Sequence, residues 1–451
     1  MVHVKARRVA VCGAGPSGLS QLHAFECARR DGYSIPDIVC FEKQTDFGGQ
    51  WNYYWRTGFD EYSEPVHSSM YHNLWTNLPK ECSEFVDYSF DEHFGQPITS
   101  FPPRTLLSNY IKGYAERNNI RQYIRFSTVV RWISYSDAKQ KFHVVVKDLR
   151  KNETQSEEFD YVIVATGHFS MPNVPYFDGI ETFSGRILHS HDFRFAQDFL
   201  GQDVLIIGNG YSAEDIALQL YKYGAKSVIV SYRTKSKGFK WPDRIKEVPL
   251  LVQIDKESVH FRDGSSHAVN AIIFCTGYVH HFPFLDDNLR LKSTNSLYPP
   301  DLYKTIVWIH QPRLLYLGMQ VLTFSFNIGN IQAWYARDLI LGKINLPITK
   351  EEMLNDMTHW QIRAKAIQNI SDYSQFTRDY IQDLIDATGY PLFNIDQMVR
   401  ILIECAQSRI ENLLTYREKT YVSTVTNTPA KQHHTPWLRE MDDRLENFLE
   451  K

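Results

Sequence analysis

A glycine-rich turn followed by basic residues is the clearest chemical signal in the sequence. Gly208, Gly210 and Ala213 form the pattern G-x-G-x-x-A between an apolar run, 204–207, and a segment that can form a helix, 215–223. In this context the first glycine allows a tight turn. The second lets the backbone approach a pyrophosphate at the helix N-terminus, where free N–H groups point at it. The turn predicts a dinucleotide site that includes Gly208, Gly210, Tyr211 and Ser212.

The end of the next apolar run indicates which dinucleotide fits. Residues 227–230 are followed by Tyr232, Arg233, Thr234 and Lys235, where an NAD site would place Asp or Glu. A guanidinium at this position suits a ribose 2′-phosphate, so the sequence predicts NADP(H). A solvated basic face after a strand is the plainer alternative, and the upstream glycines make it the weaker one.

A second motif of the same kind lies near the N-terminus. The apolar run 8–12 leads into a complete G-x-G-x-x-G, 13–18, and then into a segment that predicts a helix to about Arg30. The following run, 37–41, ends at Glu42, which lies 24 residues beyond Gly18, where a ribose-binding acid belongs. A surface carboxylate at a strand end is the alternative for Glu42. Because this second-strand end is acidic and the other is basic, we expect FAD here and NADPH at the later site.

Further candidates for the flavin site follow the first motif. Gly49 and Trp51 belong to a segment in which adjacent glycines would let the backbone and a ring approach a flat cofactor. Asn77 stands among apolar residues in a long irregular segment, 60–104, and such segments are often functional. It can be a turn residue before proline or a buried amide over a cofactor. The predicted FAD-binding residues of this part are Gly13, Gly15, Ser17, Gly18, Glu42, Gln44, Gly49, Trp51 and Asn77.

Two similar segments indicate how these units are joined. Residues 160–167 and 270–278 each read as a buried strand that ends in Thr-Gly, and each closes one dinucleotide unit. We interpret them as crossovers, with the second unit inserted in the first. The predicted fold is α/β with two Rossmann-like dinucleotide-binding domains, the NADP domain inserted in the FAD domain, and a helical C-terminal region. The expected bounds are 1–168 (FAD domain, first part), 169–279 (inserted NADP domain) and 280–451 (completion of the FAD domain and C-terminal helices).

The composition of the chain limits the classes of protein and of binding partner that remain possible. The chain has 451 residues, 43% of them hydrophobic, and a formal charge of −3, which gives no electrostatic case for nucleic acid. The scattered cysteines argue against a disulfide framework and a dithiol centre, and no apolar stretch reaches the length of a membrane span. Adjacent histidine pairs are poor metal ligands. We therefore expect a soluble, cytoplasmic protein with no metal site and no membrane or nucleic-acid partner.

Residues 183–193 carry the pattern F-x-G-x-x-x-H-x-x-x-F, the signature of flavin-containing monooxygenases. The resemblance covers nearly the whole chain. It is strongest to the soluble bacterial branch that contains trimethylamine monooxygenases, through segments such as CFEKQTDFGGQWNYYWRTG, YSAEDI and CTGYVHHFPFL. It implies that NADPH reduces FAD and that reduced FAD with O₂ forms a C4a-hydroperoxyflavin. This species oxygenates a soft nucleophile, a tertiary amine or a sulfide.

The resemblance also implies roles for single residues. Asn77 would support the oxygenated flavin, Gln320 would contact the flavin, and Tyr211 would lie near NADP⁺ and the substrate entry. Arg233 and Thr234 would hold the 2′-phosphate. His67 and Arg417 match positions that help bind the cofactors. A homodimer is the expected assembly.

One departure from that branch bears on the substrate. After Gln320 the branch usually has an acidic residue and, two positions later, Trp, whereas this chain has Val321, Leu322 and Thr323. The more apolar wall predicts a preference for larger apolar amines, sulfides or indole over trimethylamine. Baeyer–Villiger oxygenation of ketones and uncoupled NADPH oxidation remain alternatives. Phe193 stands against the first, because that class usually ends the signature in Trp.

Overall fold

Short runs of apolar residues without alternation form a mainly parallel sheet that is covered on both faces. The computed structural model describes residues 7–293, 296–321, 323 and 325–450. The strand order of this larger sheet is β18-β19-β20-β7-β1-β2-β3. Its strands are β1 (Arg8–Cys12), β2 (Asp37–Phe41), β3 (Ile124–Arg125), β7 (Tyr161–Val164), β18 (Leu302–Tyr303), β19 (Val307–Trp308) and β20 (Leu314–Tyr316). The sheet therefore combines strands from both ends of the chain.

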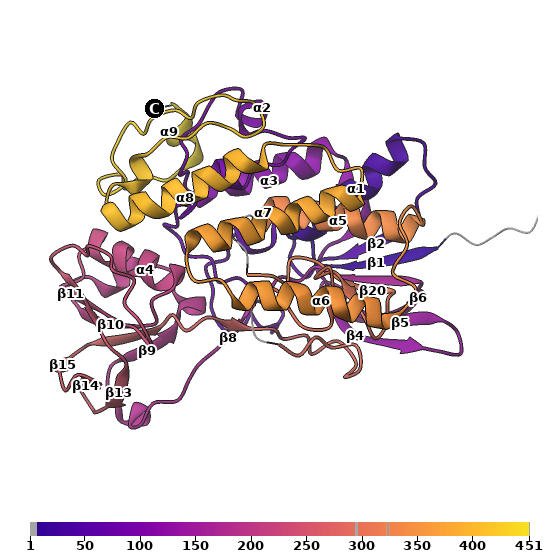
Figure 1. Ribbon diagram of the computed structural model, residues 1–451. Helices are drawn as coiled ribbons and strands as arrows, with labels where there is room; N and C mark the ends of the chain where they lie inside the picture. The colour runs from indigo at the N-terminus through magenta and orange to yellow at the C-terminus, as the bar shows by residue number, and fades with distance from the viewer. Residues whose placement is uncertain (1–6, 294–295, 322, 324, 451) are drawn as a thin grey trace, which may run out of the picture.

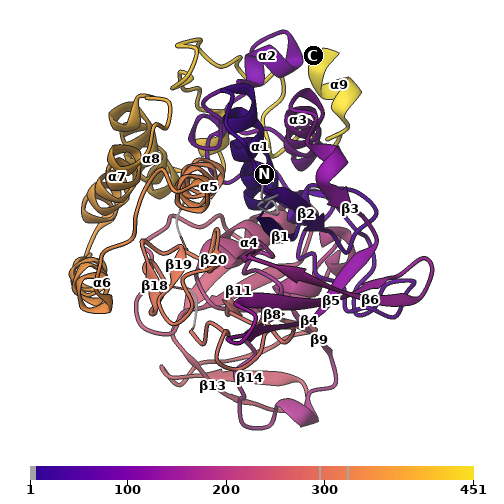
Figure 2. The same cartoon turned by 90° about the vertical axis from the view of Figure 1, so that its right-hand side faces the viewer.

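This sheet is the middle of three layers (Figure 1). On one face lie α1 (Pro16–Arg30), α3 (Arg104–Arg117) and α5 (Ser325–Leu341). On the other lies an antiparallel sheet of β4 (Thr128–Ser136), β5 (Lys141–Asp148) and β6 (Glu153–Phe159). Figure 2 shows the same layering from the side. Residues 60–103 are mostly irregular, as predicted for 60–104, with the short α2 (Phe90–Phe94).

The inserted unit forms its own parallel sheet, of order β12-β11-β10-β16-β9. Its elements are β9 (Arg186–His189), β10 (Asp203–Ile207), α4 (Tyr211–Lys222), β11 (Ser227–Ser231), β12 (Ile245–Val248) and β16 (Ala271–Phe274). A small antiparallel sheet comprises β13 (Leu251–Ile254), β14 (Ser258–Phe261) and β15 (Ser266–Ala268). The insertion of one dinucleotide-binding fold in another is thus confirmed.

The two crossovers lie side by side. β8 (Met171–Pro172) follows the first crossover and pairs antiparallel with β17 (Tyr278–Val279), which follows the second. All strands of the inserted sheet lie between these two. The exact boundaries at 168 and 279 stay a prediction.

After β20 the chain is mainly helical from α5 to residue 411 and largely irregular from 412 to 444. The helices after α5 are α6 (Lys350–Lys365), α7 (Ile370–Ala387), α8 (Ile395–Glu411) and α9 (Leu445–Glu450). Thr349 and Glu352 form a capping box at the start of α6, and Asn369 caps α7. Short 3₁₀ turns occur at Gly49–Trp51, Lys80–Cys82, Ile120–Tyr123, Ile180–Thr182, Ser190–Asp192, Ala196–Phe199 and Tyr416–Glu418.

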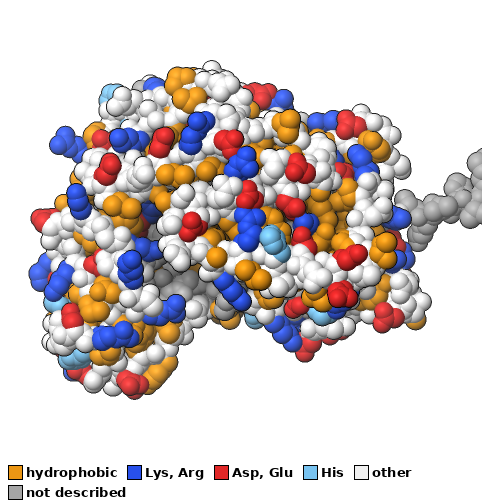
Figure 3. Space-filling model, in the orientation of Figure 1, with side chains coloured by type: hydrophobic (Ala, Val, Ile, Leu, Met, Phe, Trp, Pro, Cys, Tyr) orange, Lys and Arg blue, Asp and Glu red, His pale blue; other side chains and the backbone are white. Residues whose placement is uncertain are grey.

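The surface and the helices give two further observations. Lys and Arg side chains are interspersed with Asp and Glu over the face seen in Figure 3. Within the described ranges, no helix combines the length and apolarity needed to cross a bilayer.

Candidate active site

One large cleft receives the carboxyl ends of both parallel sheets. Its volume of about 1950 Å³ exceeds the roughly 300–1,000 Å³ of an ordinary small-molecule pocket and leaves room for two dinucleotides. Most residues predicted as site residues line it: Gly13, Gly15, Ser17, Glu42, Gln44, Gly49, Trp51, His67, Asn77, Gly210, Tyr211, Ser212, Arg233 and Gln320. Gly18, Gly208, Thr234 and Arg417 are not part of its lining.

The first glycine turn leaves a helix N-terminus open to the cleft. Gly15 caps α1 without a side-chain hydrogen bond, so the first N–H groups are available to an anion. Gly18 allows close packing, because a Cβ on it would lie 1.9 Å from the carbonyl oxygen of Gly13. Gly13 has a φ of +100°, which favours glycine. These glycines therefore keep the turn tight and its amides accessible.

The carboxylate of Glu42 is fixed at the end of β2. One oxygen accepts a hydrogen bond from the Ala14 amide at 2.7 Å and the other from the Gln44 amide at 2.8 Å. Burial raises the pKa of Glu42, and these amide contacts oppose the shift. A fixed acceptor on the cleft wall fits a ribose hydroxyl, as a dinucleotide site requires.

The turn at Gly49 packs directly on the first glycine motif. A Cβ on Gly49 would lie 2.9 Å from the Cα of Gly15. The same turn directs Trp51 edge-on to Phe326, with ring centroids 5.9 Å apart. The residues present therefore form a narrow groove between backbone and ring that fits a flat cofactor.

The second glycine turn repeats this arrangement in the inserted domain. Gly210 caps α4 without a side-chain hydrogen bond, and a Cβ on it would meet no atom within 4 Å in the described structure. Gly208 has a φ of +115° and packs on the carbonyl of Cys275. Arg233 and Lys237 line the cleft beyond β11. Open backbone beside two cations fits a pyrophosphate and a ribose 2′-phosphate.

The family model described as flavin-binding monooxygenase-like matches residues 6–241 and 243–400. The chain belongs to this family. It is 54% identical over 441 residues to trimethylamine monooxygenase of Methylocella silvestris, with 98% of each chain covered. Its structure is similar to the crystal structure of Tmm from Pelagibacter sp. strain HTCC7211 (TM-score 0.95, 47% identity, 98% and 100% covered). It is also similar to S-allyl-L-cysteine S-oxygenase from Allium sativum (TM-score 0.79, 28% identity, 92% and 95% covered).

The family resemblance predicted from the sequence is thereby confirmed, together with a flavin-dependent monooxygenase activity and the cofactors FAD and NADPH. FAD supplies oxygen activation when bound, and NADPH supplies the hydride. The chain's own residues must hold both cofactors and keep water away from the reacting atoms.

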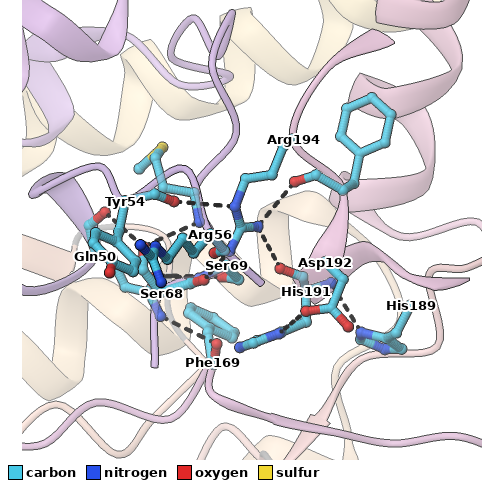
Figure 4. A network of polar contacts seen from close by, with 12 residues as sticks. Gln50, Tyr54, Arg56, Ser68, Ser69, Phe169, His189, His191, Asp192 and Arg194 are labelled. Atoms are coloured by element: carbon cyan, nitrogen blue, oxygen red, sulfur yellow. Dashed lines mark hydrogen bonds and ion pairs between the residues drawn. The ribbon is translucent and has the colours of Figure 1, made fainter. Parts of the chain in front are cut away.

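Arg194 directly follows the signature of residues 183–193. It connects this signature to the loop of residues 54–68 in the FAD domain (Figure 4). Its guanidinium is buried and donates to backbone carbonyl oxygens at 2.7 to 3.1 Å. The acceptors are Tyr54, Arg56, Ser68, His191 and Phe193. Gln50 adds a further link, donating to the carbonyl of Phe169 at 3.1 Å. The signature thus fixes the loop that carries His67.

Arg417 acts behind the cleft wall of this monooxygenase and not on its surface. It is 1% exposed, forms an ion pair with Asp215, and donates to the carbonyl oxygen of Thr76 at 3.1 Å. Asp215 lines the cleft, and Thr76 precedes Asn77. Arg417 therefore holds two segments of the wall in place, and its help in cofactor binding stays a prediction.

Three histidines around the crossovers are neutral at ordinary pH. Burial lowers the pKa of His67, His168 and His189 to about 4. The Nδ1 atom of His168 lies 2.7 Å from the carbonyl oxygen of Gly318, and the Nε2 atom of His189 lies 3.1 Å from that of Gly277. Neutral imidazoles can hydrogen-bond here without adding charge to the cleft.

The wall beyond Gln320 includes residues that sequence reasoning missed. The Tyr373 hydroxyl accepts from the Thr323 amide at 2.9 Å and lies 3.0 Å from the Thr323 hydroxyl. Val321 and Tyr373 line the cleft, while Leu322 lies outside the described residues. Gln320 donates to the carbonyl of Leu297 at 2.9 Å. No local spacing announces Tyr373, because it reaches the cleft only through the packing of α7.

Proposed function

We propose that this monooxygenase oxygenates the nitrogen of tertiary amines and the sulfur of sulfides, using NADPH and O₂. The observation that carries the proposal is the single cleft onto which both glycine turns open. Full-length similarity to trimethylamine monooxygenase of Methylocella silvestris supports amines, and similarity to the S-oxygenase of Allium sativum supports sulfides. A soft nucleophile of either kind can accept activated oxygen without a protein nucleophile.

Within this proposal the chain's residues bind, orient and exclude water. The open end of α1 and Glu42 hold FAD, and the open end of α4 and Arg233 hold NADPH. Asn77 lines the cleft, where its amide can donate to an oxygen atom at the flavin. Tyr211 is 46% exposed, and the guanidinium of Arg409 lies 4.5 Å from its ring centroid. We assign Tyr211 to the contact between NADP⁺ and the substrate entry.

The substrate side of the cleft favours apolar substituents. Val321 and Ile370 line it, and Tyr373 adds a ring whose hydroxyl is engaged by Thr323. The neighbouring carboxylate of Asp215 is paired with Arg417, so it cannot serve a small ammonium ion as a free counter-charge. We infer that tertiary amines with larger apolar groups, and aryl sulfides, react more efficiently than trimethylamine.

A substrate panel with product analysis tests this function. NADPH consumption, O₂ uptake, H₂O₂ and product are measured with trimethylamine, a dimethylbenzylamine, an aryl methyl sulfide, indole and a cyclic ketone. We expect N-oxide and sulfoxide, with a higher kcat/KM for the bulkier amine. A lactone from the ketone would favour Baeyer–Villiger chemistry, and H₂O₂ equal to NADPH with every compound would identify an oxidase. A strong preference for trimethylamine would contradict the role of the apolar wall but would leave the oxygenase function standing.

Replacing Asn77 tests its assignment. In Asn77→Ala we expect several-fold more H₂O₂ per NADPH and correspondingly less N-oxide, because the amide that supports oxygen transfer is lost. Flavin content should stay near one per chain. Asn173→Ala removes another amide of the cleft wall, on the crossover side, and should keep the ratio of product to NADPH. An unchanged ratio in Asn77→Ala would remove that residue from the mechanism.

The homodimer and the cytoplasmic location also stay predictions. Size-exclusion chromatography with light scattering tests the first, and fractionation of the native cell tests the second.

A further inference from the structure

A cluster of potential metal ligands lies on α1, outside the cleft lining. His23 and Cys27 are four residues apart and therefore share one face of the helix. Asp87 approaches them from the irregular segment between α1 and α3. His23 Nε2 is 3.2 Å from Cys27 Sγ and 3.1 Å from an Asp87 carboxylate oxygen. All three ligand atoms lie within 4.8 Å of one another.

Hydrogen bonds alone cannot satisfy both contacts of His23 Nε2 in this cluster. A ring nitrogen carries either one hydrogen or one lone pair, so His23 Nε2 cannot fully serve both the thiol and the carboxylate. A cation placed between the three atoms would bond to all of them. The distances are close to the spacing of ligand atoms around a tetrahedral ion with bonds of about 2.0 to 2.3 Å.

The other ring nitrogen of His23 has the support that metal-binding histidines usually have. His23 Nδ1 lies 2.6 Å from the Tyr114 hydroxyl, and the Asn330 amide donates to that hydroxyl at 3.0 Å. His23 is 1% exposed, so its ring is held in one orientation. Such outer contacts fix the ring and keep its free nitrogen aimed at the ion.

A buried phenol in this region offers a hydrogen-bond partner for a fourth ligand. The Tyr390 hydroxyl has no hydrogen-bond partner within the described residues. Tyr390 lies within electrostatic range of Asp87 and Cys27. A water molecule bound to an ion at the cluster could accept or donate a hydrogen bond to this phenol.

Contrary to the expectation of no metal site from the sequence, we propose that His23, Cys27 and Asp87 bind a divalent ion of the zinc type, with water in the fourth position. Sulfur, nitrogen and carboxylate oxygen together favour Zn²⁺ over Mg²⁺ or Ca²⁺. The thiol loses its proton to solvent as the ion binds. The Cys27 thiolate and the Asp87 carboxylate together balance the charge of a divalent ion. The bound ion would join α1 to the segment that carries Asn77.

The test uses FAD-loaded, tag-free enzyme that has been treated with a chelator and then titrated with Co²⁺. We expect one equivalent to produce d–d absorption bands at longer wavelength than oxidised flavin, and Zn²⁺ to abolish them by displacement. One equivalent of Zn²⁺ should also raise the thermal unfolding midpoint. Enzyme that binds no stoichiometric Co²⁺ or Zn²⁺ overturns the proposal without any variant.

Two variants and a matched control locate the binding. Cys27→Ser and Asp87→Asn should each lower the affinity for Zn²⁺ at least 100-fold, with unchanged flavin content as the check of folding. Asp255→Asn removes a carboxylate that pairs with His260 at 2.6 Å but is not grouped with a thiol, and it should keep the full stoichiometry. Equal binding in wild type and Cys27→Ser would overturn the assignment. N-oxide formation is measured in parallel. Absence of metal binding can then be told apart from absence of the proposed amine oxygenase activity.

Discussion

At the level of single residues, Arg233 is the proposed determinant of the choice between nicotinamide cofactors. It lies beyond β11 on the cleft wall, where a 2′-phosphate is expected. In Arg233→Ala we expect KM for NADPH to rise roughly 10- to 100-fold, the loss expected for a charge-assisted hydrogen bond. KM for NADH should change little, because NADH has no 2′-phosphate. Steady-state kinetics with both cofactors measures the difference.

The matched control for this prediction is Arg262→Ala. Arg262 is an exposed arginine of the same inserted domain and is not part of the cleft lining. Its loss should leave both KM values near wild type. A parallel rise for NADPH and NADH in Arg233→Ala would remove the 2′-phosphate assignment.

The glycine motifs and Glu42 could be placed from the sequence, because local spacing dictates the turn, the helix start and the strand end. Arg417 could be recognised as a site residue only by resemblance, and its position behind Asp215 and Thr76 was not predictable. Asp215 and Tyr373 reach the cleft through tertiary packing. No residue near Tyr373 in sequence signals a ligand, and although Asp215 follows the second glycine motif, its pairing with Arg417 is not signalled by the sequence.

At the level of elements, two buried ion pairs join the C-terminal part to the N-terminal half of α4. Arg409 on α8 pairs with Glu214, and Arg417 pairs with Asp215. Glu214→Gln leaves the Arg409 guanidinium buried without its counter-charge, so we expect a loss of about 3–5 kcal/mol in the free energy of unfolding. Urea unfolding followed by fluorescence measures this loss.

An exposed pair provides the comparison. Glu158 and Lys139 form an ion pair on the antiparallel sheet, and such surface pairs contribute little. Glu158→Gln should unfold like wild type. Similar unfolding curves for Glu214→Gln and wild type would show that the pairs do not clamp α8 to α4.

The main elements were predictable where apolar runs end at a distinctive turn. β1, α1 and β10 follow directly from their sequences, whereas α4 begins at Tyr211, four residues before the predicted start at 215. The similar crossovers predicted the insertion. The packing of α6, α7 and α8 was not predictable beyond a helical region. Amphipathic patterns identify the buried face, as for Tyr380 and Leu384, but not the element that covers it.

For the whole molecule, neutral histidines make stability depend on pH. Burial lowers the pKa of His189 from about 6.5 to about 4 on folding. Between these values the unfolded chain binds a proton that the folded chain does not. The free energy of unfolding therefore falls as pH decreases through this range, at up to about 1.4 kcal/mol per pH unit for this histidine.

The variant His189→Asn removes this titration. Its unfolding free energy, measured from pH 7 to 4.5, should vary less steeply than that of wild type. The buried acids Glu42 and Asp215, whose pKa values are raised, contribute with the opposite sign but equally in both proteins. Parallel pH profiles would contradict a buried neutral His189.

The pairing of β8 with β17 gives the inserted domain the topology of an exchangeable cassette. Its two ends enter and leave as neighbouring strands, which lie about 4.8 Å apart in a sheet. A replacement domain must present its own ends at that spacing, and it must also supply partners for Arg409 and Arg417, which pair with Glu214 and Asp215 of the present domain. Recombination at this strand pair could thus supply the same flavin module with a different source of reducing equivalents.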